Sequence, residues 1–226
     1  METTATATPI HAPIKSYVLR QGRMTLGQRR GVEEILPTMR FNAATLPALP
    51  TGGKRICEIG FGNGEVLLHH AAQHPDNRYI GMEVHAPGVG HLMIGVETQA
   101  LTNITVHHGD AMQALHNLPD GSLDELWLFF PDPWHKARHN KRRIVRPDFI
   151  ATVTQKLKVG GVWRLATDWE DYAQQMLALL NAAEGLRNTA ADSGYAPRFD
   201  GRKLSHFEAR GGRLGHGVWD LCYARV

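Results

Sequence analysis

The sequence predicts an α/β fold, with one domain built around a mainly parallel, doubly wound sheet. Three observations lead to this prediction. Strand-like and helix-like segments alternate from about residue 54 onward, a glycine-rich loop joins the first strand to the first helix, and no linker divides the chain. A length of 226 residues suits one such domain. We expect a disordered tail over residues 1–14, a basic arm over 15–53 and the folded domain over 54–226.

The elements follow from apolar runs and from the residues that begin and end them. A short helix is expected near Gln28–Leu36, and the Pro/Gly/Thr-rich stretch Pro47–Gly53 marks the entry to the main domain. The expected strands are Arg55–Ile59, Tyr79–Glu83, Ile104–His108, Leu123–Phe130, Val162–Thr167 and Gly217–Val226. The expected helices are Glu65–His74, one within Pro87–Leu101, Asp110–Leu118, Pro147–Leu157, and one that opens at Thr167 and ends near Glu184.

Two of these helices carry start signals. Pro147 suits the first turn of a helix, because its missing N–H would have no partner there. Thr167 and Glu170 have the spacing of a capping box, in which the two side chains satisfy free amides of the first turn. We therefore expect the second of these helices to begin at this pair.

The net charge of the chain is small, but its basic residues are clustered. The formal net charge is +3, and basic residues cluster in Lys15–Arg40 and in His135–Arg146, the second of which has six Lys/Arg and no acid. Such clusters suit a polyanionic partner, although a solvated face is the alternative. Cys57 and Cys222 lie in apolar runs without metal spacing, and the 13 histidines are dispersed. We expect reduced cysteines, no metal and a cytoplasmic location, since no segment resembles a signal peptide or a membrane span.

A glycine-rich loop, Glu58–Gly64, follows the first strand with the pattern E-x-G-x-G-x-G. Gly60, Gly62 and Gly64 are candidate cofactor-binding residues, since glycine lets a backbone turn sharply and approach a ligand. The spacing differs from the G-x-G-x-x-G pattern of dinucleotide sites. Glu58 would repel a diphosphate but attract a ligand that carries ammonium and sulfonium groups.

Carboxylates stand at the ends of three successive strands. Glu83 ends the second strand, where it can accept hydrogen bonds from ribose hydroxyls, and Asp110 follows the third, close to an adenine. Each has an alternative: Asp110 could only cap the next helix, and Glu83 could be a solvated strand end. Together with Glu58 they predict a nucleoside cofactor at the carboxyl edge of the sheet.

The fourth strand leads into a stiff loop, Phe130–Trp134, of sequence FPDPW. Two prolines restrict the backbone around Asp132. The loop continues into the cationic stretch His135–Arg146, which can neutralise phosphates without reading base sequence. Trp134 is expected either to pack in the protein or to stack on a base.

These motifs resemble the bacterial tRNA (guanine-N7-)-methyltransferases, which are class I S-adenosylmethionine-dependent enzymes. The resemblance covers most of the chain from Ser16. It implies a Rossmann-like, seven-stranded sheet with an antiparallel C-terminal strand, and methyl transfer from S-adenosylmethionine to N7 of a guanosine in the tRNA variable loop. The segments that carry it are Ser16–Arg29 (SYVLRQGRMTLGQR), Glu58–Glu65 (EIGFGNGE), Gly81–Glu83 (GME), Phe130–Val145 (FPDPWHKARHNKRRIV), Ala166–Asp168 (ATD) and Phe207–Leu221 (FEARGGRLGHGVWDL).

The resemblance also implies residue roles. The implied cofactor contacts are Glu58, Glu83, Asp110 and Asp132, of which Asp132 is also the implied catalytic residue. The implied substrate contacts are Lys136, Asp168, Ser205, His206, Phe207 and Glu208. The implied RNA contacts are Arg138, His139, Asn140, Lys141, Arg142 and Arg143. The expected partner is tRNA, with no membrane, no obligate protein partner and a monomeric or homodimeric state.

Two departures from the family pattern weaken the implied contact with substrate. His206 stands where the family has Lys, which replaces a fixed charge with one that titrates near neutrality, and Ala137 replaces a frequent basic residue. Asp168 has an alternative as a helix cap, and Ser205–Glu208 as a solvated loop.

Three other functions compete with this prediction. A methyltransferase acting on an exocyclic amine of RNA or DNA is one, because D-P-W is loosely similar to the D-P-P-aromatic loop of such enzymes; Asp132 would then accept a proton. A non-catalytic RNA-binding protein is disfavoured by the intact carboxylates. A nicotinamide oxidoreductase is disfavoured by the glycine spacing. Binding of S-adenosylmethionine but not of NAD would separate these classes.

Overall fold

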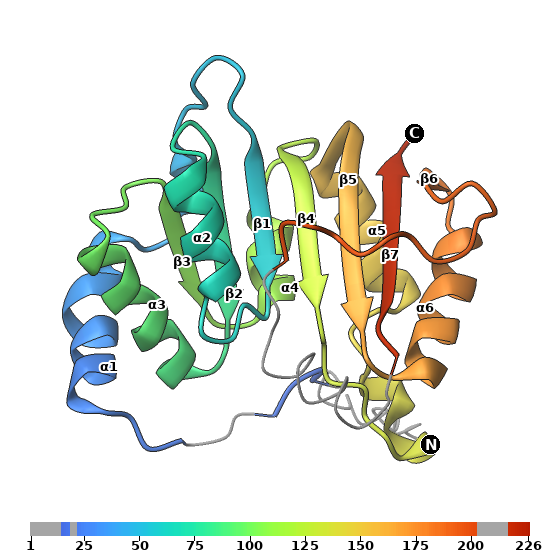
Figure 1. Ribbon diagram of the computed structural model, residues 1–226, viewed down its shortest axis with the longest axis horizontal. Helices are drawn as coiled ribbons and strands as arrows, with labels where there is room; N and C mark the ends of the chain where they lie inside the picture. Colours follow the sequence, from blue (N-terminus) through green and yellow to red (C-terminus); the bar gives the residue numbers. More distant parts are fainter. Residues whose placement is uncertain (1–14, 19–21, 203–216) are drawn as a thin grey trace, which may run out of the picture.

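Seven strands form one sheet in the order β3-β2-β1-β4-β5-β7-β6 (Figure 1). The computed structural model describes residues 15–18, 22–202 and 217–226, so the predictions for 1–14 and for Ser205, His206, Phe207 and Glu208 lie outside the described residues. The strands are β1 (Arg55–Ile59), β2 (Arg78–Glu83), β3 (Ile104–His108), β4 (Leu123–Phe129), β5 (Leu157–Thr167), β6 (Leu186–Asn188) and β7 (Trp219–Arg225).

The pairing confirms the predicted fold class. The β3-β2-β1-β4-β5 part of the sheet is parallel throughout. β7 runs antiparallel to both β5 and β6. The chain passes from the outer strand β3 back to β4 on the other side of β1, so the strand order reverses between β1 and β4. This reversal is where open α/β sheets hold their ligands, outside the carboxyl ends of the strands.

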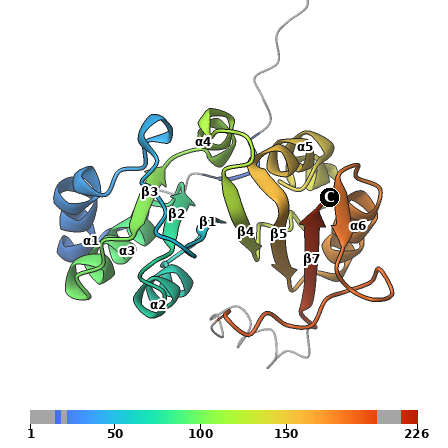
Figure 2. The ribbon, with the colours of Figure 1, turned by 90° about the horizontal axis from the view of Figure 1, so that it is seen from above.

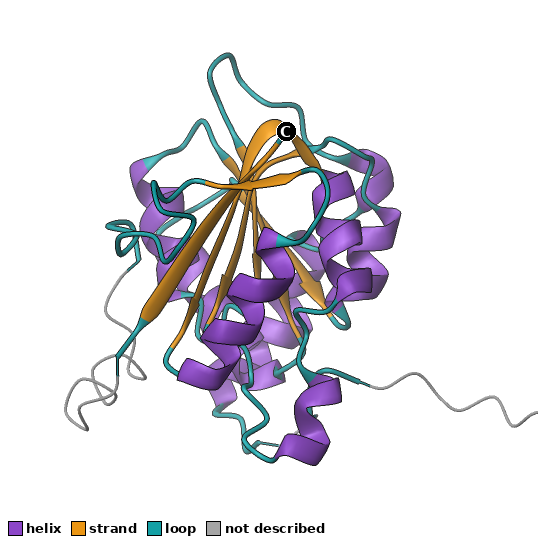
Figure 3. Cartoon of the chain, turned by 90° about the vertical axis from the view of Figure 1, so that its right-hand side faces the viewer, coloured by secondary structure: helices purple, strands orange, loops and turns teal. Residues whose placement is uncertain are grey.

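Helices cover both faces of the twisted sheet (Figures 2 and 3). The helices are α1 (Leu26–Arg30), α2 (Glu65–Gln73), α3 (Ala86–Thr98), α4 (Ala111–Asn117), α5 (Pro147–Lys156) and α6 (Glu170–Asn181). On one face, Leu115, Phe149 and Tyr172 of α4, α5 and α6 belong to a buried cluster. On the other face, Leu67 and Leu92 of α2 and α3 are likewise buried. No helix among these described residues is long and apolar enough to cross a membrane.

The helix of the arm begins earlier than predicted and changes type. α1 begins after Thr25, which forms a capping box with Gln28, and the chain continues through a π-helical turn, Gly31–Ile35, and a 3-10 turn, Leu36–Thr38. A Cβ on Gly31 would lie 2.5 Å from the carbonyl oxygen of Gly90 in α3. Glycine at this crossing lets the arm lie directly against α3.

Two other predictions were wrong in detail. The capping box expected at Thr167 does not form, because Thr167 is buried and still pairs with Trp219 in the sheet; its hydroxyl instead accepts the Trp169 N–H at 3.2 Å. Trp169 is the N-cap of α6. Strand β6 was not predicted, since its three residues are too few to show a period of two.

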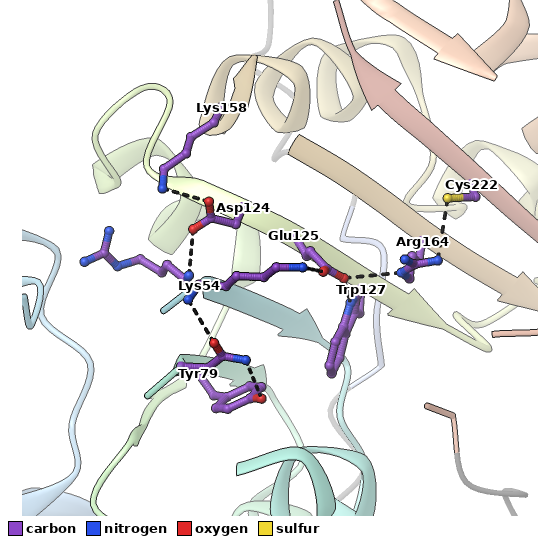
Figure 4. A network of polar contacts seen from close by, with 10 residues as sticks. Lys54, Tyr79, Asp124, Glu125, Trp127, Lys158, Arg164 and Cys222 are labelled. Carbon is purple, nitrogen blue, oxygen red and sulfur yellow. Dashed lines mark hydrogen bonds and ion pairs between the residues drawn. The ribbon is translucent and has the colours of Figure 1, made fainter. Parts of the chain in front are cut away.

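A network of polar contacts joins β1, β4 and β5 near the edge where β1 and β4 begin (Figure 4). Glu125, which is buried, accepts hydrogen bonds from Lys54 and from the Trp127 indole, each at 3.0 Å, and from Arg164 at 3.3 Å. Asp124 pairs with Lys158 at 2.8 Å. These contacts hold β1, β4 and β5 in register at the edge where parallel strands begin.

Candidate active site

A cavity of about 390 Å³ lies at the carboxyl ends of β1, β2 and β4, at the reversal of strand order. Predicted residues from four different segments meet in its wall, namely Gly60, Glu83, Asp110 and Asp132. The arm contributes Ser16, Tyr17 and Val18 to the same wall. The structure therefore brings together most of the predicted cofactor residues, and it adds arm residues that the sequence did not place there.

The glycine loop has the backbone shape that its sequence requires. Gly60, Gly62 and Gly64 have φ of 71°, 58° and 76°, a region that residues with a Cβ avoid. A Cβ on Gly60 or Gly62 would meet no atom within 4 Å. The loop therefore leaves open space at its first two glycines for a bound group.

Glu83 ties this loop to the end of β2. Its Oε2 accepts the Gly62 N–H at 2.9 Å, and its Oε1 accepts the N–H groups of Val84 and His85 at 2.7 and 2.9 Å. A carboxylate offers about four acceptor positions, so three are in use and about one remains for a ligand hydroxyl. Glu83 is buried, so the alternative that it is a solvated strand end is wrong.

Glu58 directly precedes Ile59 and Gly60, which line the cavity, but it is not itself among the lining residues. Burial, with a smaller contribution from Glu83, raises the pKa of its carboxyl group to about 8. Its Oε2 is buried and has no hydrogen-bond partner among the described residues. A buried acceptor without a donor is costly, and a nearby cationic ligand would both lower this pKa and offset the cost. Glu58 thus fits a cofactor that bears positive charge.

Asp110 both caps a helix and lines the cavity, which were its two expected positions. Its Oδ1 accepts the Met112 N–H at 2.9 Å and caps α4, while the residue also lines the cavity. Tyr17 of the arm lies close to it: burial and then the Asp110 carboxylate raise the pKa of the Tyr17 phenol. The arm therefore meets the third strand end inside the cavity.

The loop Phe130–Trp134 is strained at both of its ends. Phe130 and Trp134 each have φ of 51°, which for residues with a Cβ costs about 1–3 kcal/mol each. Between them, Asp132 is exposed and lines the cavity, and its Oδ1 accepts the Trp134 N–H at 3.0 Å. Surrounding contacts must offset the cost of this strain. The same contacts hold Asp132 in one place beside the cavity.

Two buried arginines lie against the loop Phe130–Trp134. The sequence did not predict that either of them contacts this loop. Arg143 donates from Nε to the Pro133 carbonyl at 2.9 Å, and its other nitrogens bond to Gln175 and Asp171 of α6. Arg202 pairs with Asp220 at 3.0 Å and lies 5.0 Å from the centre of the Phe130 ring. Each has another basic residue directly beside it, Arg142 and Lys203, so the sequence does not distinguish them.

Trp134 packs inside the protein and does not offer a face to a base. Its Nε1 donates to the Ser16 carbonyl at 3.2 Å, and the guanidinium of Arg142 lies 4.9 Å from the ring centre. The ring of His139 meets it edge-on at 5.9 Å. This environment favours the packing alternative for Trp134 over the stacking role.

The cationic stretch after this loop forms a 3-10 helix, η4 (Ala137–Arg142), rather than an irregular loop. Lys136, Arg138 and Lys141 are exposed, whereas the predicted RNA contact Arg143 is only 1% exposed. The ring centres of His135 and Trp169 lie 4.3 Å apart. Lys136 and Asp168, their neighbours in the sequence, therefore belong to adjoining segments. Asp168 does not cap α6, because Trp169 occupies that position.

The described residues hold no group of three or more His, Cys, Asp or Glu that could bind a metal ion. Cys57 and Cys222 are free thiols, and burial raises the pKa of the Cys57 thiol above its usual range. The residues that line the cavity include the carboxylates of Glu83, Asp110 and Asp132 and the aromatic rings of Tyr17, Phe129 and Phe130.

Comparison with known proteins places this arrangement in a family. The family model described as "Putative methyltransferase" matches residues 53–221. A tRNA (guanine-N(7)-)-methyltransferase of Pseudomonas entomophila is 52% identical over 222 residues, with 96% of this chain and 92% of the relative covered. One of Shewanella putrefaciens is 48% identical over 219 residues, with 94% and 92% covered.

The crystal structure of the 16S rRNA methyltransferase KamB is similar with a TM-score of 0.57 at 12% identity, covering 83% of this chain and 99% of that one, which shows the shared fold. The sequence relatives show more, because they are about half identical to this chain over at least 94% of its length. On that evidence the chain belongs to the tRNA (guanine-N(7)-)-methyltransferase family.

Proposed function

We propose that this protein transfers a methyl group from S-adenosylmethionine to N7 of a guanine in the variable loop of tRNA. The family supplies the reaction class and the nucleic-acid substrate. The observation that carries the proposal to this chain is the meeting of Glu83, Asp110 and Asp132 in one cavity, with exposed cations leading away from the same loop.

The cavity residues suit the proposed cofactor. When bound, S-adenosylmethionine supplies an electrophilic methyl group attached to a sulfonium. Glu83 keeps about one acceptor position for a ribose hydroxyl, and Gly60 and Gly62 leave room for a close approach. Glu58 provides a buried negative charge once ionised, which favours a cationic ligand over a phosphate.

The chemistry at guanine N7 requires alignment more than proton transfer. N7 has an in-plane lone pair and carries no proton at neutral pH, so no strong general base is needed. Holding the reacting atoms in line can lower the barrier by up to about 7–11 kcal/mol. Asp132, fixed by its bond to the Trp134 N–H, accepts hydrogen bonds from guanine N–H groups and stabilises the positive charge that moves to the base.

The exposed cations give the enzyme its hold on tRNA. Lys136, Arg138 and Lys141 project from the segment that follows Asp132. Cations placed there neutralise backbone phosphates and give an affinity that falls with added salt. They thereby deliver the RNA to the cavity, while sequence discrimination is left to contacts with bases.

The product decides between the proposed reaction and its alternatives. The purified chain is incubated with isotopically labelled S-adenosylmethionine and unmodified tRNA, and the RNA is digested to nucleosides. We expect labelled 7-methylguanosine that maps to the variable loop. A label on an exocyclic amine would instead support the competing amine methyltransferase, and its appearance would refute the proposal.

A further inference from the structure

The geometry points to Arg143 as a positioning residue that orients Asp132, and not as a contact to RNA. Arg143 belongs to the cationic stretch by sequence, and nothing in the sequence separates it from Arg142 beside it. The inference rests on the proposed role of Asp132 in methyl transfer. It concerns how the protein holds that side chain beside the cavity.

The guanidinium of Arg143 has no surface left for a phosphate. The residue is 1% exposed, and each of its three nitrogens donates within the protein. The acceptors are the Pro133 carbonyl, Gln175 and Asp171. A phosphate could reach Arg143 only by displacing these partners. Exposed Arg138 and Lys141 of the same stretch have no such burial.

One peptide group connects Arg143 to Asp132. The Pro133 carbonyl and the Trp134 N–H belong to the same planar unit, which moves as one body. Its oxygen accepts from Arg143 at 2.9 Å, and its N–H donates to Asp132 Oδ1 at 3.0 Å. The two bonds lie on opposite sides of a trans peptide, so Arg143 fixes the rotation of the unit that holds the carboxylate.

The strained φ of Trp134 explains why this bond is needed. That angle of 51° describes the rotation immediately after the shared peptide group. Such a conformation persists only where surrounding contacts determine it. Without Arg143 the peptide is free to relax toward a common conformation, and the Asp132 carboxylate moves with it.

Helix α6 provides the rigid support for this device. Asp171 and Gln175 are four residues apart and therefore share one face of the helix. Between them, the buried ring of Tyr172 lies 4.7 Å from the Arg143 guanidinium. Arg143 thus connects the loop that carries Asp132 to a helix packed in the core.

Arg143→Lys separates positioning from phosphate binding. A lysine keeps the charge, so a phosphate contact would be largely retained, but it cannot bond to three acceptors in a fixed plane. We expect kcat to fall about 10–100-fold, since a displacement near 1 Å can cost about 100-fold. We expect the KM for tRNA, and its dependence on salt, to stay within about twofold of the wild type.

Two further variants complete the test. Asp171→Ala removes one of the acceptors of Arg143 from an exposed position of α6, and we expect it to lower kcat at least about threefold while the protein remains folded. Arg138→Ala is the matched control at an exposed cation; it should raise the KM for tRNA and reduce the salt slope by about one.

The inference is overturned if Arg143→Lys and Asp171→Ala both keep the wild-type kcat. It is equally overturned if Arg143→Met raises the KM and lowers the salt slope as Arg138→Ala does. Failure of the proposed function is distinguishable, because the wild type would then yield no 7-methylguanosine or Asp132→Ala would remain fully active. If those two controls hold, a negative result concerns Arg143 alone.

Discussion

Glu58, Glu83 and Asp132 bear the same functional group in three different environments. Among the residues that the structure describes, Glu58 is buried and its Oε2 has no donor, Glu83 is buried and has three backbone donors, and Asp132 is exposed and has one. The order of residues indicates that acids stand at strand ends. It does not indicate their burial, which depends on the residues that other segments place above them.

Glu58 makes the stability of the protein depend on pH in a specific direction. Its pKa is about 8 in the folded chain and near 4.5 in a solvated carboxyl group, so the folded state binds the additional proton. Its contribution to stability is complete below about pH 4.5 and is lost as pH rises through about 8. Glu58→Gln, which has no charge to bury, should therefore gain stability relative to wild type between pH 6 and 9.

Thermal unfolding at pH 6, 7, 8 and 9 measures this difference. By pH 9 we expect the variant to gain on the order of 1 kcal/mol, or roughly 2–4 °C in melting temperature, relative to its difference at pH 6. Glu65→Gln, at an exposed position of α2, is the control and should follow the wild type. Parallel curves for Glu58→Gln and wild type would mean that Glu58 is not held in a low-dielectric site.

Asp132 can be tested for charge and for structure separately. Asp132→Asn keeps an acceptor for the Trp134 N–H but removes the negative charge, whereas Asp132→Ala removes both. We expect kcat losses of at least about 100-fold for Asn and more for Ala, if stabilising transition-state charge is the main role. Single-turnover methyl transfer with saturating tRNA measures them. Full turnover by Asp132→Ala would remove the residue from the mechanism.

Sequence alone could not assign the residues whose role depends on where the side chain points in the folded protein. Arg142 and Arg143 are adjacent and chemically equal, yet one covers the Trp134 ring and the other reaches Pro133 inside the protein. Trp134 itself was compatible with two roles until its burial was known. Arg202 had no motif at all. In each case tertiary packing decides what the side chain contacts.

At the scale of elements, regular patterns were predictable and short or competing ones were not. The five parallel strands follow from apolar runs, with β5 beginning at Leu157 rather than at Val162. The glycines that turn the chain into α2 were also evident. The capping box at Thr167 failed because sheet pairing with Trp219 holds that residue in an extended strand. Local spacing yields to tertiary contacts in such places.

The network around Glu125 should stabilise the sheet from the edge where its strands begin. Glu125→Ala leaves the Trp127 N–H and Arg164 without this partner inside the protein, and we expect a loss of about 1–3 kcal/mol in the free energy of unfolding. Lys54→Ala, at a half-exposed side chain, should cost less than about 1 kcal/mol. Urea denaturation of both variants measures this difference.

Binding of S-adenosylmethionine provides the control for that prediction. Glu125 lies near the start of β4, and the cavity lies beyond its end. The affinity of folded Glu125→Ala for the cofactor should therefore stay within about twofold of wild type. A large loss of affinity without loss of stability would show that the two edges are not independent.

Across the whole molecule, the side of the sheet where the strands begin and the side where they end differ in the residues that they carry. The edge where the strands begin carries the ion pairs of Glu125 and Asp124, and the edge where they end carries the cavity and the cationic stretch. The sequence predicted this division only in part. It identified the strand ends and the cations, but the entry of the arm through Ser16 and Tyr17 follows only from the fold.

The proposed electrostatic delivery of tRNA involves this whole edge. The double variant Arg138→Ala/Lys141→Ala removes two exposed cations, and the slope of log affinity against log salt should become shallower by roughly two. Filter binding of tRNA between about 50 and 200 mM salt measures the slope. An unchanged slope would place the RNA on another surface of the protein.

We propose that the strand ends hold the methyl donor beside Asp132. A crystal structure of the protein with S-adenosylhomocysteine would show where the cofactor lies. We predict the ribose at Glu83, the adenine toward Asp110 and the sulfur facing Asp132. Density for the ligand elsewhere on the molecule, or in this cavity with the sulfur turned away from Asp132, would contradict the account.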